Sequence, residues 1–352
     1  MPKNIRVATF NCENLFSRPL IFEENKKDSL QLLKYVSQLQ EELRKEVFDQ
    51  KVIKELKKEL KGYITINDIR GKHDKVSGSN EWLGSIDFIR SPFLKGAIEN
   101  TARVINDVNA DVICLVEVED RPTLQKFHDD LLYPLFLKKD GKPRYEYIFL
   151  IDGNDPRGID VSIMSRLPIQ WIRSHINDAA TINNKLRRIF SRDCLEVQVE
   201  LSDKKFLHIL VNHLKSMGYN FSKDDPKGDI LRKIQAQRVA ELIDTHNLKN
   251  EYVIVAGDLN SYPDSASLFP LLNKENLYNV NLELEPSERW TYKQNKKQID
   301  YLIVSDALKK KLGNVCIERR GIFTKTGKHY DEVKNDLTAA SDHAALSADF
   351  QL

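Results

Sequence analysis

The chain has 352 residues, of which 41% are hydrophobic, enough for one large domain or two ordinary ones with a substantial core. Its 54 basic and 52 acidic residues leave a formal charge of +2, so no global positive field favours tight nonspecific nucleic-acid binding, although a local basic groove is compatible with this balance. No run reaches the roughly 20 apolar residues of a membrane span, and the N-terminal segment lacks an apolar leader core. We therefore expect a soluble, cytoplasmic protein, unless a secretory signal has been trimmed.

Runs of β-branched and aromatic residues recur along the chain and predict strands. In chain order they cover residues 5–10, 111–119, 145–151, 159–165, 194–201, 206–214, 252–260, 299–305 and 345–350. Apolar positions three and four apart predict helices over residues 97–109, 123–136 and 230–246. Nine strands rarely stay in one flat sheet, so the pattern predicts an α/β or α+β protein with more than one sheet.

Residues 17–96 differ in texture from the rest of the chain. A charged, amphipathic helical stretch covers residues 28–63, and its mixed Glu and Lys residues are more typical of a solvated face than of a binding patch. Residues 71–84 are typical of a loop. We predict one domain over residues 1–352, with 17–96 as an insertion after the first strand that packs over the domain or forms a lid.

Four cysteines, Cys12, Cys114, Cys194 and Cys316, are far apart in sequence. No C-x-x-C pair indicates zinc or redox chemistry, and most of the four lie in apolar strand-like runs. We interpret them as reduced thiols in or near the core.

Polar residues that could do chemistry occur where apolar runs end or begin, a position at which sites are often built. They are Asn11, Glu117, His213, Asp258, Asn260, Asp300, Asp342 and His343. The stretch VAGDLNSYPDS (255–265) is on its own typical of a turn, because Gly, Asp, Asn, Pro and Ser all favour turns. If strand geometry continues through it, Asp258 and Asn260 point to the same face, as do His213 and Lys215.

A carboxylate, an amide, an imidazole and an ammonium group presented together suit a phosphate that is attacked by water. Glu117 ends a very apolar run, and burying an uncompensated carboxylate is costly, so a cation or a catalytic role is favoured there. Carboxylate and amide oxygens of Glu117, Asp342 and Asn11 are hard ligands that suit Mg²⁺ or Mn²⁺, in one- or two-metal form.

Nine motifs in this order resemble the endonuclease/exonuclease/phosphatase superfamily over nearly the whole chain outside the insertion. They are TFNCENL, LVEVED, PRGIDVSIMSR, SRDCLEV, VNHLKS, QAQRVAEL, GDLNSYPDS, QIDYLIVS and SDHAAL. The resemblance implies a deoxyribonuclease I-like four-layer sandwich, with two packed, mostly antiparallel sheets flanked by helices. The superfamily includes abasic-site endonucleases, sphingomyelinases and inositol-polyphosphate phosphatases.

The resemblance also implies roles for individual residues. Glu117 would bind the cation with Asn11 and Asp342. Asp258 would orient or deprotonate the attacking water, Asn260 would hold the phosphate, and His343 paired with Asp300 would stabilise charge or transfer a proton. His213 would contact the phosphate, with its own partner left open.

Five further residues are candidates for phosphate or substrate binding: Arg157, Asp160, His175, Arg192 and Lys215. The arginines could clamp a phosphate, or Arg192 could pair with Asp193 or another acid. Asp160 could orient His213 or an arginine, or simply cap its strand.

The leading hypothesis from the sequence is a metal-dependent phosphodiesterase acting on DNA or RNA. The alternatives are a phosphatase or phosphodiesterase acting on a small-molecule or lipid phosphate, and an inactive binding module. No protein partner is predicted.

Overall fold

The computed structural model describes residues 4–17, 19–22, 24–68, 76, 82–90, 96–182, 184–201, 204–218 and 225–352. The chain divides into two compact units, one made of Met1–Phe16 with Leu94–Leu352 and the other of Ser17–Phe93. Most of the loop predicted over residues 71–84 lies outside the described residues, as does the segment 91–95 of the predicted insertion.

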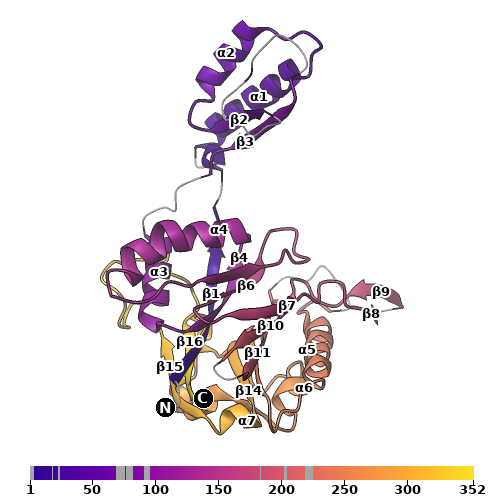
Figure 1. Cartoon of the computed structure of the whole chain (residues 1–352), viewed down its shortest axis with the longest axis vertical. Coiled ribbons are helices and arrows are strands. Elements are labelled where there is room, and N and C mark those ends of the chain that lie inside the picture. The colour runs from indigo at the N-terminus through magenta and orange to yellow at the C-terminus, as the bar shows by residue number, and fades with distance from the viewer. Residues whose placement is uncertain are drawn as a thin grey trace. The chain divides into compact units, whose positions relative to one another are not determined.

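Two six-stranded sheets form the larger unit (Figure 1). The first sheet has the order β15 (Leu312–Glu318), β16 (Ala345–Gln351), β1 (Asn4–Leu15), β4 (Val112–Val118), β6 (Asp160–Ser165) and β5 (Tyr147–Leu150). The second has the order β13 (Leu277–Asn279), β14 (Asp300–Ser305), β12 (Tyr252–Asp258), β11 (Phe206–His213), β10 (Cys194–Glu200) and β7 (Ile169–Arg173). A small hairpin pairs β8 (Ala179–Ile182) with β9 (Lys185–Arg188).

The two sheets share one pattern of strand directions. In each sheet the two central strands are parallel, β1 with β4 and β11 with β12, and every other neighbouring pair is antiparallel. Parallel neighbours require a crossover, and each crossover contains a helix: α3 (Ala97–Val108) follows β1, and α5 (Asp229–Ile243) follows β11. The carboxyl ends of these four central strands are the frame of the site described below.

The main core lies between the two sheets. Branched aliphatic side chains from both inner faces form one buried cluster, with Val7, Val116, Val197, Ile209 and Leu302 among its members. Strands covered on both faces need continuous apolar sequence, which explains runs such as VICLVEV in β4.

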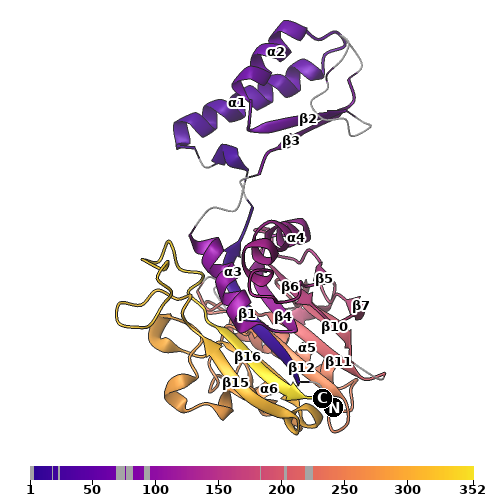
Figure 2. The same cartoon turned by 60° about the vertical axis from the view of Figure 1, so that its left-hand side comes forward.

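Helices cover the outer faces of the two sheets, which gives four layers (Figure 2). A second cluster packs α5 and α6 (Phe269–Leu272) on the outer face of the second sheet, and α3 and α4 (Arg121–Phe127) contact strands of the first. This architecture confirms the predicted fold class, and all nine predicted strands are present. The sequence patterns did not predict the short or edge strands β7, β13 and β15.

One predicted helix has a different form in the structure. The segment predicted as a single helix over residues 123–136 is α4 followed by a π-helical segment, η2 (His128–Leu137). Pro134 lies inside this segment, and a proline cannot supply the N–H that a regular α-helical turn needs. Short helical elements complete the unit: η3 (Val280–Glu283), η4 (Pro286–Glu288), η5 (Gln294–Lys296) and α7 (Asp306–Lys309).

The smaller unit contains η1 (Leu20–Phe22), α1 (Lys26–Leu43), α2 (Gln50–Glu59) and the hairpin β2 (Ile64–Asp68) with β3 (Gly84–Phe88). Side chains of Asn25 and Asp49 cap the two α-helices, and the unit has a core of its own that includes Leu39, Ile53 and Ile66. A search of the described residues for a helix with the length and apolar character of a bilayer span finds none.

The cysteines are unpaired, and three of them are buried as expected. Cys316 is a correction, because it is exposed. It lies on the edge strand β15, where alternate side chains face outward.

Candidate active site

A cleft of about 530 Å³ lies where the carboxyl ends of central strands from both sheets meet. Its walls include Glu117 near the end of β4, His213 at the end of β11 and Asp258 at the end of β12, together with Asp342 and His343 from the segment before β16. Residues from distant parts of the sequence therefore reach one place because two parallel strand pairs end on the same side of the sandwich.

Bulges in the first sheet turn acidic side chains into this cleft. Glu117 has φ = 64°, and the pairing register of β4 shifts between Val116 and Val118. Glu13 has φ = 48° within a similar irregularity between Asn11 and Leu15 of β1. A left-handed conformation at a non-glycine residue costs free energy and often occurs at functional positions.

Gly257 lets the end of β12 approach β11 closely. Its φ is +128°, and a Cβ atom at this position would lie 1.9 Å from the carbonyl oxygen of Asn212. Only glycine fits this backbone, and the next residue is Asp258. The predicted turn follows, where the N–H of Ser265 donates to the carbonyl oxygen of Tyr262.

Asp258 is buried and accepts hydrogen bonds on both carboxylate oxygens. The backbone N–H of Asn260 donates to Oδ1 at 2.8 Å, while Nδ2 of Asn260 and Nδ2 of Asn11 donate to Oδ2 at 3.2 and 3.1 Å. Burial and the nearby Asp300 raise the pKa of Asp258. Strand geometry ends at Asp258, since Asn260 has φ = 50°, so the two side chains meet through a local turn and not through the predicted strand alternation.

His343 and Asp300 form a buried pair beside Asp258. Nδ1 of His343 lies 2.9 Å from Oδ2 of Asp300, and Nε2 lies 3.9 Å from Oδ2 of Asp258. Burial favours the neutral ring, but Asp300 and Asp258 outweigh it and raise the pKa of His343 to about 10. The three residues also offer ligand atoms within 4.8 Å of one another, close enough to hold a metal ion.

His213 lies beside Asp258 and Glu117, and its pKa is shifted in the opposite direction from that of His343. Its Nε2 lies 3.7 Å from Oδ2 of Asp258 and 3.9 Å from Oε1 of Glu117. Burial and the charge of Arg192 lower the pKa of His213 well below its ordinary value, which favours the neutral ring. Nδ1 of His213 is buried and has no hydrogen-bond partner among the described residues.

The acidic side of the cleft fits a divalent cation. The backbone N–H of Asp342 donates to Oε2 of Glu13 at 2.8 Å, which brings two carboxylates together. Burial and the charge of Asp342 raise the pKa of Glu13, and burial raises the pKa of Asp342. Nδ2 of Asn11 lies 3.4 Å from Oε1 of Glu117, and Oδ1 of Asn11 accepts from the backbone N–H of Glu13 at 3.0 Å, so Asn11 orients Glu117 through its nitrogen. Crowded carboxylate oxygens are donors that Mg²⁺ and Mn²⁺ prefer.

Two arginines form the basic wall of the cleft, and both pair with an acid that sequence reasoning did not identify. Arg157 binds Asp155 through two nitrogens at 2.9 and 2.7 Å, and Nε of Arg192 lies 3.1 Å from Asp155. Arg192 is therefore paired with Asp155 and not with Asp193. Lys215 does not line the cleft, but it lies close enough to Arg192 and Arg157 for their charges, added to burial, to lower its pKa.

Besides Lys215, two further predicted site residues lie outside the cleft. The structure corrects the prediction for His175, whose ring nitrogens contact Asp178 and Glu196 at 3.1 and 3.2 Å and so have no capacity left for a substrate. Asp160 is buried and accepts from the backbone N–H of Gly153 at 2.9 Å. Through this hydrogen bond Asp160 supports the Gly153 loop, and it does not line the cleft. Burial raises the pKa of Asp160 to about 7.

Several cleft residues were not predicted from the sequence. Glu13, Asn14, Tyr262 and Tyr292 all line the cleft, and the rings of Tyr292 and His343 lie 4.8 Å apart. Glu13 and Asn14 follow Asn11 in NCEN, where two polar residues at the end of an apolar run were the available signal. The tyrosines gave no signal, because isolated aromatic residues in loops are common.

The four layers and the acid, amide and imidazole groups at the strand ends define a protein of the deoxyribonuclease I-like fold. The chain belongs to the endonuclease/exonuclease/phosphatase family of phosphoesterases, since that family's model matches residues 91–328. No curated protein matches the sequence significantly.

Two solved structures of bacterial family members share the fold, and a third protein is similar at a lower TM-score. A family member from Bacteroides thetaiotaomicron matches with a TM-score of 0.50 and 12% identity, covering 99% of this chain and 95% of that one. A member from Beutenbergia cavernae matches with a TM-score of 0.50 and 19% identity, covering 74% and 67%. D. rerio TDP2 complexed with single strand DNA product matches with a TM-score of 0.48 and 17% identity, covering 73% and 94%.

Proposed function

We propose that this protein is a divalent-metal-dependent phosphodiesterase that cleaves nucleic acid by attack of water on phosphorus. One observation carries the proposal. The buried Asp258, hydrogen-bonded by two amide side chains, faces a neutral His213 and a His343 paired with Asp300 across one cleft. A base, hydrogen-bonding groups and a cationic group are thus present within one site.

Asp258 acts on the attacking water. Asn11 and Asn260 hold its Oδ2, and the backbone of Asn260 holds its Oδ1, so the orientation of the carboxylate is fixed before substrate binds. A raised pKa makes a carboxylate a stronger base than an exposed aspartate, which favours removal of a proton from water.

The two histidines have different roles because their charges differ. His343, kept cationic by Asp300, stabilises the negative charge that develops on the phosphate oxygens. The neutral His213 contacts the phosphate through Nε2 by a hydrogen bond. Arg157 and Arg192 on the adjacent wall bind the flanking phosphate or the leaving strand.

Glu117 and Asp342, with the neighbouring Glu13, would hold the cation, and Asn11 would orient Glu117 through its Nδ2. When bound, Mg²⁺ or Mn²⁺ supplies Lewis-acid polarisation of a phosphoryl oxygen and positive charge for the leaving group.

Aromatic residues support nucleic acid as the substrate class. Tyr262 and Tyr292 line the cleft, and tyrosine rings are stacking surfaces for unpaired bases. Among the described residues, the cleft wall carries two arginines and no extended basic track. This favours a single strand or a strand end over a duplex bound along its length.

The test is a substrate panel with the wild type and the Asp258→Asn variant, in Mg²⁺, in Mn²⁺ and in excess chelator. The substrates are single- and double-stranded DNA, RNA, an inositol phosphate and a phosphocholine lipid. We expect cleavage of single-stranded nucleic acid by the metal-loaded wild type alone. Turnover of only the inositol phosphate or the lipid would replace the substrate class, and no turnover of any substrate would overturn the proposal.

A further inference from the structure

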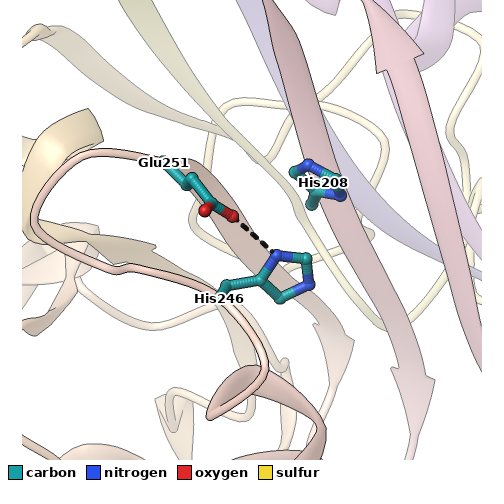
Figure 3. A group of neighbouring side chains, drawn as sticks. All are labelled: His208, His246 and Glu251. Carbon is teal, nitrogen blue, oxygen red and sulfur yellow. Dashed lines mark hydrogen bonds and ion pairs between the residues drawn. The ribbon is translucent and has the colours of Figure 1, made fainter.

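A second group of titratable side chains lies at the opposite end of β11 and β12 from the cleft. His208 is near the start of β11, Glu251 directly precedes β12, and His246 lies in the segment between α5 and β12 (Figure 3). His208 and His213 are five residues apart on one strand, which corresponds to about 17 Å at about 3.3 Å per residue. The group is therefore separate from the catalytic cleft.

The three side chains are arranged around a common space (Figure 3). Nδ1 of His246 lies 3.0 Å from Oε2 of Glu251, and the rings of His208 and His246 are 4.4 Å apart. One ligand atom from each residue lies within 4.8 Å of the others. Glu251 is exposed and both histidines are partly exposed, so an ion can enter from solvent.

One ring nitrogen in this group has unmet bonding capacity. Nδ1 of His208 is buried and makes no hydrogen bond within the described part of the chain, whereas Nε2 of His246 has Oε1 of Glu196 at 3.6 Å. The side chain of His246 is only 9% exposed. Leaving buried polar atoms without partners is costly, and most such atoms in proteins are satisfied by a protein group, water or an ion.

We propose that His208, His246 and Glu251 bind a Zn²⁺ ion. Two zinc ligands at about 2.0 to 2.1 Å in tetrahedral geometry are about 3.3 Å apart, close to the spacing of His246 and Glu251. Because the ligand atoms all lie within 4.8 Å of one another, closing the group by at most about 1.5 Å brings the third ligand atom into range. Two imidazoles and one carboxylate, with water in the fourth position, suit Zn²⁺ better than Mg²⁺.

Surrounding residues hold the histidines as zinc sites require. Nε2 of His246 lies 3.6 Å from Oε1 of Glu196, so a ring bound to metal through Nδ1 directs its remaining N–H toward a carboxylate. Glu196 is itself fixed by Nε2 of His175 at 3.2 Å, which gives the buried His175 a positioning role. The ring centroid of Trp171 lies 6.0 Å from that of His208.

Binding is tested by equilibrium dialysis of the full chain against Zn²⁺ in the presence of excess Mg²⁺, followed by elemental analysis of the protein. The variants are His246→Ala and Glu251→Gln, and the latter keeps the size of an exposed side chain and so preserves the fold. His329→Ala is the matched control, because it removes an imidazole outside both sites. Co²⁺ then gives an optical readout of four-coordinate nitrogen and oxygen ligation.

We expect the wild type and His329→Ala to retain one more equivalent of zinc than His246→Ala and Glu251→Gln. Zinc should also raise the unfolding temperature of the wild type but not of Glu251→Gln. Equal zinc content in the wild type and both site variants, or no zinc in any of them, would overturn the proposal. All of these readouts are independent of catalytic activity.

Discussion

The two ends of the parallel pair β11–β12 carry different chemistry on one scaffold. At the carboxyl end, His213 is paired in register with Asp258, and oxygen ligands from the first sheet face them. At the amino end, His208 is paired with Val253, and imidazole nitrogens predominate beside one carboxylate. The same two strands thus present hard ligands at one end and borderline ligands at the other.

Under the two proposals, the carboxyl end would carry catalysis and the amino end would bind a structural ion. The carboxyl end is lined by strand ends of both sheets and keeps open space for a substrate. The three side chains at the amino end come from β11, the segment after α5 and the residue before β12. An ion bound by them would link the two ends of the β11–β12 crossover and would not reach the cleft. Variants at one end should therefore leave the other end unchanged.

The largest expected effect is from Asp258→Asn. Loss of the base should lower kcat by about 10³-fold or more while leaving zinc retention at the other end intact. Steady-state hydrolysis and zinc content measured on the same preparation check both parts. A variant that loses zinc together with activity would contradict the independence of the two ends.

His343→Ala and Asp300→Asn rank next. Removing the cationic ring should lower kcat by about 10² to 10³-fold. Asp300→Asn should have a smaller effect, because the ring remains but its positive charge is less favoured. The order of the two rates is the readout, and a larger loss in Asp300→Asn would argue against this assignment of roles.

Gly257→Ala tests the close approach of the two strands. A Cβ atom 1.9 Å from the Asn212 carbonyl oxygen forces the backbone apart, so we expect a loss of about 2–4 kcal/mol in the free energy of unfolding. Urea unfolding measures it. Gly313→Ala is the control, since its Cβ atom would make an ordinary contact at 3.4 Å, and equal losses in the two variants would refute the explanation.

Asp160→Asn should have the smallest effect, and it depends on pH. An acid with a higher pKa in the folded state than in the unfolded chain binds its proton more tightly when folded. Its buried charge therefore destabilises the fold progressively from about pH 4, and fully above the folded pKa of about 7. The variant, whose amide oxygen still accepts from Gly153, should be about 1–2 kcal/mol more stable than the wild type at pH 8 and equal to it near pH 4. Unfolding curves at both pH values decide this.

Strand positions could be read from the sequence, and the grouping of most candidate site residues could be predicted, because both depend on local signals. A very apolar run that ends in a carboxylate, as at Glu117, marks a strand end, and several such ends belong to one edge when the strands are parallel. Strand alternation predicts that Asp258 and Asn260 lie together. In the structure they do lie together, but a left-handed turn at Asn260 brings them there.

Other features depend on distant partners and leave no local pattern. Asp155 pairs with both arginines, and His175 contacts Glu196 on β10. These partners are brought together by the packing of the strands, so no local sequence pattern indicates them. The group of His208, His246 and Glu251 is of the same kind, because its members lie on three different segments.

The most direct test of the central claim is the rate of phosphodiester hydrolysis as a function of Mg²⁺ concentration for the wild type, Glu117→Gln and the control Glu200→Gln. Glu200 is a carboxylate at the end of β10 outside the cleft. We predict saturable activation by Mg²⁺ in the wild type and in Glu200→Gln, and a loss of about 10²-fold or more in Glu117→Gln that higher Mg²⁺ partly restores. A wild-type rate independent of Mg²⁺ and resistant to chelator, or an unchanged Mg²⁺ response in Glu117→Gln, would contradict a metal-dependent active site in this cleft.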